Sequence, residues 1–343
     1  MELAEEIVFT QKELVVDDRC VAQDVFVPLL TTIAGNNIEA VILYGSRLLG
    51  ANPGRHSAYD LVIIVDDYSS FYGNLYVAKM IHRFPLVMTI MNHFLPPNVI
   101  RLAPQGLDGP IAKCLVLNRV DFERSLAIEK ARDHFMISRM MQKIQVIYSR
   151  HELVREWVQD NLAIARYGVL TWATLWIKQP FDSKSLGREM LRICYQSENR
   201  PESASRSDAI FSSQEEELVK YYADVLVEAE SKGDVVREGS GYRVSGTTSV
   251  TTRFRRAVYF KLSKLRVTLS WLKHVVTFEG WLPYIVRKVE RRTGTQINLT
   301  TIEKILPIPF LFPRVLHVFW NRPDTEAEVN QDFGKDADQG RTD

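Results

Sequence analysis

A glycine–serine pair and a lone aspartate are the residues of this sequence whose types and spacing best suit chemistry. Gly45 and Ser46 follow the apolar run "IEAVILY", and Asp60 is the second residue of another run, "YDLVIIV". Glycine lets the backbone approach a phosphate closely, and exposed N–H groups and a serine hydroxyl donate to its oxygens. A carboxylate can hold Mg²⁺, which prefers oxygen ligands. The pattern predicts a site for a metal-bound nucleoside triphosphate; the alternative is a β-hairpin with a solvated Asp60.

Nucleotidyl transfer is the reaction that such a site would serve. It requires positioned phosphates, hydrogen-bond donors and metal charge, and Arg47 adds a charge-assisted donor beside Ser46. A second aspartate is usual two positions after the first, but that position is Val62. The candidates for a second metal ligand are Asp66, Asp67, Asp121 and Asp133. We expect Asp121, which follows a predicted strand, to join Asp60 at the metal, although a plain loop aspartate is the more common explanation of such a residue.

The elements that position these residues follow from hydrophobic periodicity. The sequence predicts an amphipathic helix over 20–35 that ends at Gly35, and strands over 38–45, 59–65 and 111–120. Helical periodicity also covers 74–94, with a break near Pro85, and 129–148. Residues 1–150 are therefore predicted to form an α/β domain, a small mixed sheet with flanking helices.

The rest of the chain is predicted to be mainly helical. Residues 151–250 combine helices with "DVVREGSGYRVSG", a hairpin or wing with Ser240-Gly241 at its turn. Residues 251–320 are a basic amphipathic segment, which we expect Gly280 and Pro283 to divide into two helices. The window 253–294 holds eleven Lys and Arg against two Glu, a local net charge of +9. The polar, acidic tail over 321–343 is predicted to be disordered.

Composition and charge exclude several classes of protein. The chain has 343 residues, of which 46% are hydrophobic, so it can bury a sizeable core. Its net charge is only +1, so we expect no nucleic-acid partner. The three cysteines are far apart and form neither a disulfide framework nor a zinc ligand set.

The expected location is the cytoplasm, on the inner face of the cell membrane. The N-terminus "MELAEEIVFT" is acidic, unlike a secretory signal or a transit peptide. No run reaches the roughly 20 apolar residues that span a bilayer. The basic segment carries tryptophan and an apolar stripe, which suits anionic lipid. A basic face that packs on the protein itself and a segment that binds nucleic acid are the alternatives.

The motifs, taken in order, resemble one family: the mitochondrial translocator assembly and maintenance proteins, which are mitochondrial-type phosphatidate cytidylyltransferases (CDP-diacylglycerol synthases). The family has "YGSG" followed by a strand with a single aspartate, as here at Gly45 and Asp60. Further similar segments are "MNHFLPPNVIRLAPQGLDGPIAKCLVLN", "DHFMISRMMQKIQVIY" and "LGREMLRICYQSENRPE". The resemblance covers roughly residues 20–205 and suggests a bacterial-type member.

The resemblance assigns three further residues to the site. It equates Arg139 and Lys143 with an Arg and a Lys of the family's helix, and Arg200 with the Arg of its "GD.RM" motif. These cations would bind the phosphates, with Lys143 taking part in catalysis beside Asp60. The sequence departs from the family at three places: Arg47 instead of glycine follows Ser46, Ile144 follows Lys143, and Pro201 follows Arg200.

The resemblance also implies fold and function. It implies a nucleotidyltransferase-like domain, a winged-helix-like domain and a membrane-associating C-terminal segment. The reaction would be the Mg²⁺-dependent transfer of CMP from CTP to phosphatidic acid, giving CDP-diacylglycerol and pyrophosphate at an anionic membrane surface. Two alternatives stay open: a nucleotidyltransferase whose acceptor is a sugar phosphate, a protein or an RNA end, and a non-catalytic membrane-binding module.

Overall fold

The computed structural model describes residues 21–49, 58–104, 109–197, 204–246 and 249–278, together with residue 286. The chain divides into two units, Met1–Glu279 and Gly280–Asp343, and every element below lies in the first. The predicted tail and the predicted break at Gly280 and Pro283 lie outside the described residues. The predicted domain boundaries near residues 150 and 250 stay predictions.

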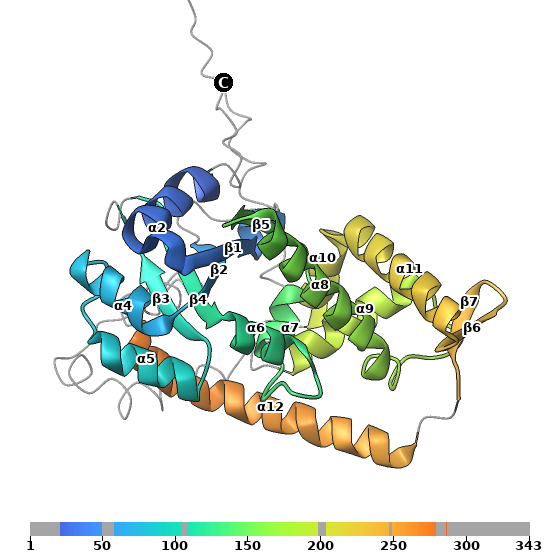
Figure 1. Ribbon diagram of the computed structural model, residues 1–343. Coiled ribbons are helices and arrows are strands. Elements are labelled where there is room, and N and C mark those ends of the chain that lie inside the picture. The colour runs from blue at the N-terminus through green and yellow to red at the C-terminus, as the bar shows by residue number, and fades with distance from the viewer. Residues whose placement is uncertain are drawn as a thin grey trace, which may run out of the picture. The chain divides into compact units, whose positions relative to one another are not determined.

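A five-stranded mixed sheet occupies the N-terminal half of this unit (Figure 1). Its strands are β1 (Ile38–Tyr44), β2 (Tyr59–Val65), β3 (Asn98–Leu102), β4 (Ala112–Asn118) and β5 (Ile144–Ser149). Their order is β3-β4-β2-β1-β5; β2 and β4 are parallel, and the other neighbours are antiparallel. The predicted mixed sheet is thus confirmed.

Helices precede, connect and follow the strands. Those of the N-terminal half are α2 (Val27–Ala34) after a π-helical turn η1 (Ala22–Phe26), α3 (Ser46–Leu49), α4 (Tyr68–Val77), α5 (Pro85–Phe94), α6 (Arg119–Leu126) and α7 (Phe135–Met140). Those of the C-terminal half are α8 (Glu152–Gly168), α9 (Ser183–Gln196), α10 (Ala204–Ser212), α11 (Glu215–Lys232) and α12 (Val250–Thr277). Gly35 ends α2 with a φ of 52°, as the sequence predicts.

Both faces of the sheet are covered, which explains the unbroken apolar runs in β1, β2 and β4. One face packs against η1, α2, α4 and α5 through Phe26, Leu30, Phe71, Tyr72 and Met88. The opposite face carries Ile42, Val62, Ile64, Leu115 and Leu117, all fully buried. Helices α6, α8 and α12 contact the strands as well.

Three local predictions are wrong. The helix predicted over 129–148 ends at Met140, and "IQVIYS" pairs with β1 as strand β5. The run after α5 forms an additional edge strand, β3, that periodicity did not predict. The hairpin of β6 (Val235–Glu238) and β7 (Gly241–Val244) does form, but its turn is Gly239-Ser240, because Glu238 pairs with Gly241. Short apolar runs fit both the helical and the strand periodicity, so the strands available for pairing decided which structure formed.

Candidate active site

Gly45 and Asp60 are in direct contact at one edge of the sheet. Gly45 ends β1 with a φ of 86°, a conformation that favours glycine. A Cβ atom at Gly45 would lie only 2.6 Å from Oδ2 of Asp60. The Asp60 carboxylate therefore occupies the space that any other residue would need, and the two sequence-predicted residues meet.

Strand register extends this contact into a row of side chains. Tyr44 pairs with Asp60, Asp60 with Lys113, and Lys113 with Arg101. Ile144 of β5 completes the row on the other side of Tyr44. Side chains paired in register point to the same face of a sheet. Asp60 is thus flanked by Lys113 and, one strand further, by Arg101, none of them fully buried.

Helix α12 brings His274 into the electrostatic surroundings of Lys113. The pKa of His274 lies well below its usual value, mainly because the ring is buried. The positive charges of Lys273, Lys113 and Arg139 lower it further. The ring of His274 on α12 is therefore neutral at pH 7 and lies within electrostatic reach of Lys113 and Arg139. The side-chain amine of Lys113, the register partner of Asp60, gives the neighbourhood of Asp60 positive charge.

Arg139 itself is held by its own helix. Its Nη1 donates a 2.7 Å hydrogen bond to the carbonyl of Phe135, and its guanidinium carbon lies 3.4 Å from the centroid of the Phe135 ring. These contacts hold the guanidinium against Phe135, the first residue of α7. The site role predicted for Arg139 stays a prediction.

Ser46 and Arg47 form the first turn after β1. Leu48 and Leu49 donate backbone hydrogen bonds to the Gly45 carbonyl, at 3.0 and 3.2 Å, which closes this turn. The guanidinium carbon of Arg47 lies 4.6 Å from the centroid of the Tyr59 ring. Tyr59 belongs to the core on the α2 face, whereas Asp60 points to the opposite face. The donor role of Arg47 beside Asp60 therefore stays a prediction, and its ring contact lies on the other face of β2.

The backbone of Lys143 lies at the edge of the sheet where Gly45 and Asp60 meet. It directly precedes Ile144, the β5 partner of Tyr44. Its Nζ forms an ion pair with Glu217 of α11, and its backbone N–H donates to Gln214 at 2.7 Å. The expectation that Arg139 and Lys143 lie on one helix is wrong, because α7 ends at Met140. The ion pair ties Lys143 to α11, so its predicted catalytic role is a proposal only.

The prediction that Asp121 shares a metal with Asp60 is wrong. Parallel pairing aligns Asp60 with Lys113 at one end of β4, and Val65 with Asn118 at the other. Asp121 follows Asn118, so it lies beyond the far edge of the sheet. There it accepts a 2.8 Å hydrogen bond from the Tyr68 hydroxyl and pairs with Arg124 at 3.3 Å. Its carboxylate serves the packing of α6 on α4.

The other aspartates considered for the metal have structural roles too. Asp66 and Asp67 follow β2 at the same far edge, and Asp67 caps α4 by accepting from the Ser70 N–H at 2.7 Å. That hydrogen bond lowers the pKa of Asp67. Asp133 accepts from the Phe135 N–H at 3.0 Å, at the start of α7. Among the residues that the structure describes, no group of three or more His, Cys, Asp or Glu could hold a metal ion. Arg200 lies outside the described residues.

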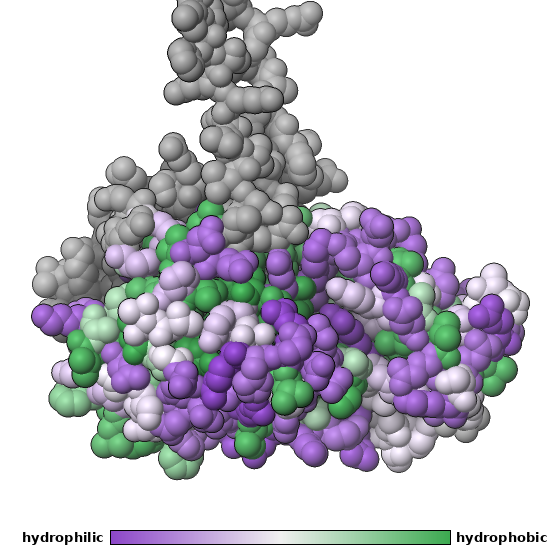
Figure 2. Space-filling model, turned by 45° about the horizontal axis from the view of Figure 1, so that its top comes forward, coloured by the Kyte–Doolittle hydropathy of each residue, from purple (hydrophilic) through white to green (hydrophobic). Residues whose placement is uncertain are grey.

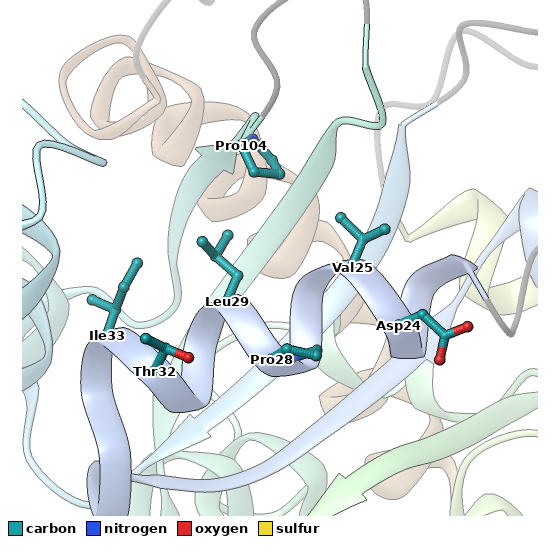
Figure 3. A pocket seen from close by; sticks show the side chains of 7 residues that line it. All are labelled: Asp24, Val25, Pro28, Leu29, Thr32, Ile33 and Pro104. Carbon is teal, nitrogen blue, oxygen red and sulfur yellow. The ribbon is translucent and has the colours of Figure 1, made fainter.

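One hollow of the surface lies away from the candidate site. A shallow hollow of about 420 Å³ lies between the outer face of α2 and Pro104 (Figure 3). Val25, Leu29 and Ile33 line it, so it is mainly apolar, and Asp24 stands at its end. Because α2 covers the face of the sheet opposite to Asp60, this hollow is separate from the candidate site.

Comparison with known proteins adds no assignment. No family model matches the chain, and a search among curated proteins finds no similar sequence.

Sequence reasoning missed Lys113, Arg101 and His274. Lys113 is the one charged residue within the apolar run "IAKCLVLN", which was a usable signal. Only the parallel register of β2 and β4, however, puts it beside Asp60. His274 approaches from more than 200 positions further along the chain, and only the course of α12 brings it there.

Proposed function

We propose that this chain is a nucleotidyltransferase that transfers CMP from CTP to phosphatidic acid and releases pyrophosphate. The observation that carries the proposal is the contact of Asp60 with Gly45, which joins the two halves of the sequence motif at one sheet edge. A glycine followed by a serine, next to a carboxylate, is the arrangement that a metal-bound triphosphate needs.

The residues fit a magnesium ion that arrives with its nucleotide. The Asp60 carboxylate lies in the space left by the missing Cβ of Gly45, and Mg²⁺ commonly takes one or two carboxylates with phosphate oxygens and water. Asp60 would hold the ion, which when bound neutralises charge on the phosphates. Asp121 has no part in this site.

The cations around Asp60 suit a reaction between two anions. A phosphate oxygen of phosphatidic acid attacks the α-phosphorus of CTP, and the bond to the bridging oxygen breaks, so that pyrophosphate leaves with the electron pair. The acceptor phosphate is ionised near neutral pH, since its second pKa is about 6, so a strong base is not required. Lys113, Arg101 and Arg139 would lower the repulsion between the two phosphates.

A lipid acceptor is favoured over a soluble one by the surface of α12. This helix carries seven Lys and Arg and no acidic residue between Val250 and Thr277. Its inner side brings His274 near Lys113, while its outer side exposes Phe254, Leu265 and Leu269. A basic helix with exposed apolar residues binds anionic membranes. No helix within the described ranges is long and apolar enough to cross one.

The test is CTP-dependent formation of CDP-diacylglycerol on phosphatidic acid vesicles with Mg²⁺. We expect Asp60→Asn to lower the rate at least about 100-fold, because the loss of metal-bound charge at a phosphoryl centre is worth several kcal/mol. Asp66→Asn, at the far edge of the sheet, is the matched control and should retain activity. Absence of turnover by well-folded wild-type protein would refute the proposal.

One observation favours a second candidate, a membrane-binding module without catalysis. The residue beside Asp60 on β4 is Lys113 and not a second carboxylate, so the site has less metal-binding charge than two-metal enzymes. Calorimetry separates the candidates: Mg²⁺-dependent CTP binding that Asp60→Asn weakens supports the enzyme. Vesicle binding without CTP binding supports the module. Pyrophosphate release with soluble acceptors alone would support the sugar phosphate, protein or RNA acceptors.

A further inference from the structure

Helix α5 presents an apolar face to the outside. Its exposed side chains are Leu86, Val87, Ile90 and Phe94, of which Leu86 is 69% and Phe94 is 71% exposed. Its buried side holds Met88 and Asn92. The amide of Asn92 donates to the Tyr72 hydroxyl and to the Val116 carbonyl, both at 3.1 Å. The helix is therefore oriented by polar contacts inside, while its more apolar side faces outward, the reverse of a water-facing helix.

The apolar surface continues beyond α5. Tyr76 and Val77 at the end of α4 are exposed, and the Tyr76 ring stacks on Phe84 with centroids 6.1 Å apart. Leu95 is 54% exposed after the end of α5. Figure 2 shows apolar side chains at the lower left of the molecule, where Figure 1 draws α4 and α5. Contiguous apolar surface of this kind marks an interaction site.

Polar contacts join α5 to α12. Nζ of Lys273 donates to the carbonyls of Leu95 and Pro97, just after α5. Arg132 donates to the Phe94 carbonyl, and Arg266 of α12 donates to the Arg132 carbonyl. Figure 1 draws both helices along the same lower side of the molecule. Two apolar-faced helices, about 170 residues apart in the sequence, are thus held beside each other.

The outer face of α12 repeats the pattern of α5. Phe254, Leu262, Leu265 and Leu269 follow one another at intervals of eight, three and four residues and are 42% to 70% exposed. Helical spacing places them on one stripe, opposite the inner side where Ser263 and Val267 are buried. The charged side chains exposed on α12 are Arg253, Arg255, Lys261, Lys264 and Arg266.

The charge of both segments has one sign. The stretch from Tyr68 to Pro97 contains Lys79 and Arg83, both exposed, and no Asp or Glu. The stretch from Val250 to Phe278 also contains no Asp or Glu. Exposed apolar side chains with cations and without acids complement an anionic lipid surface, where apolar groups enter the headgroup region and cations meet lipid phosphates.

We propose that the outer faces of α5 and α12 form one docking surface for an anionic lipid bilayer, held together by Lys273. The sequence pattern predicts lipid contact only for the C-terminal basic segment; the α5 face adds a second contact that fixes how the protein sits on the membrane. The inference rests on the proposed function for the membrane as partner. Docking on the membrane itself requires neither CTP nor catalysis. Two helices fix the orientation of the protein on the membrane, because a protein attached through one helix can still rotate about the axis of that helix.

The experiment is co-sedimentation of the full chain with vesicles of phosphatidylcholine and phosphatidylglycerol, without CTP, Mg²⁺ or phosphatidic acid. The α5 variant is Leu86→Ser, Ile90→Ser and Phe94→Ser; the α12 variant is Leu262→Ser, Leu265→Ser and Leu269→Ser. We expect each to lower the partition coefficient about tenfold or more. The matched control changes three similarly exposed residues of α8 and α11, Leu153→Ser, Ile164→Ser and Val227→Ser, and should stay within twofold of wild type.

Three further results decide the proposal. Binding should fall in pure phosphatidylcholine and at high salt, because screened cations contribute less. Asp60→Asn should bind vesicles like wild type, so a failure of catalysis leaves this inference standing. If only the α12 variant loses binding, the two-helix surface is refuted. If wild type self-associates without lipid and the α5 variant does not, the α5 face is an interface between copies, and the proposal is overturned.

Discussion

At the scale of single residues, the site depends on one atom that is absent. Gly45 has no Cβ, and the Asp60 carboxylate fills that space. Its φ of 86° is also a value that other residues adopt only at a cost. Two separate constraints, one steric and one conformational, thus require glycine before Ser46.

A comparison of Gly45→Ala with Gly35→Ala distinguishes the steric constraint from the conformational one. Both glycines have positive φ, but a Cβ at Gly35 would meet nothing within 4 Å. We expect both variants to lose about 1–3 kcal/mol of unfolding free energy from backbone strain, measured by urea denaturation. Only Gly45→Ala should also weaken Mg²⁺–CTP binding, by about tenfold or more, because its Cβ displaces Asp60. Equal nucleotide affinity of the two variants would contradict the proposed site.

At the scale of elements, an ion pair connects the sheet to the helical part. Lys143, just before β5, pairs with Glu217 of α11, and each side chain is about one-third exposed. The hydrogen bond from Lys143 is the main cause that lowers the pKa of Glu217. A partly exposed pair of this kind contributes at most about 1 kcal/mol.

Glu217→Gln should reveal this contribution through its pH dependence. A carboxyl group whose pKa is lowered by folding stabilises the protein above its unfolded-state pKa, and the contribution disappears as pH falls through the folded-state pKa. We therefore expect wild type to be more stable than Glu217→Gln at pH 6, with the difference vanishing towards pH 3. Thermal unfolding across this range measures it. A difference that grows at low pH would contradict the assigned pair.

At the scale of the whole first unit, α12 packs along elements that are far apart in sequence. Its Phe260 ring lies 5.0 Å from the His134 ring, 6.1 Å from Trp172 and 5.6 Å from Trp176, centroid to centroid. Further along the helix, Lys273 reaches the loop before β3. One 28-residue helix thus contacts both the sheet and the helical part.

Phe260→Ala should destabilise the entire unit. Removing an aromatic ring from such a cluster costs about 2–4 kcal/mol, since a cavity remains. Phe254→Ala, on the same helix but 70% exposed, is the matched control and should change the unfolding free energy by less than about 0.5 kcal/mol. Circular dichroism and tryptophan fluorescence should show one shared transition for Phe260→Ala. Separate transitions would show that α12 does not couple the two parts.

The sequence determined the elements whose signals are local. The β-branched run of β2, the presence of the β6–β7 hairpin and the end of α2 at Gly35 depend on neighbouring residues, so they could be predicted, although the position of the hairpin turn was wrong by one residue. The pairing of Gly-Ser with Asp60 was also predictable, since two consecutive antiparallel strands end and begin at the same edge of a sheet.

Tertiary structure decided everything that depends on register and on long-range packing. Asp121 and Lys113 lie on opposite ends of β4, and only the parallel pairing with β2 shows which of them adjoins Asp60. The segment of β5 fits helical and strand periods alike until β1 provides hydrogen-bond partners. The outward apolar face of α5 is set by the Asn92 contacts inside. Such choices are made by contacts between distant residues, which a local pattern does not contain.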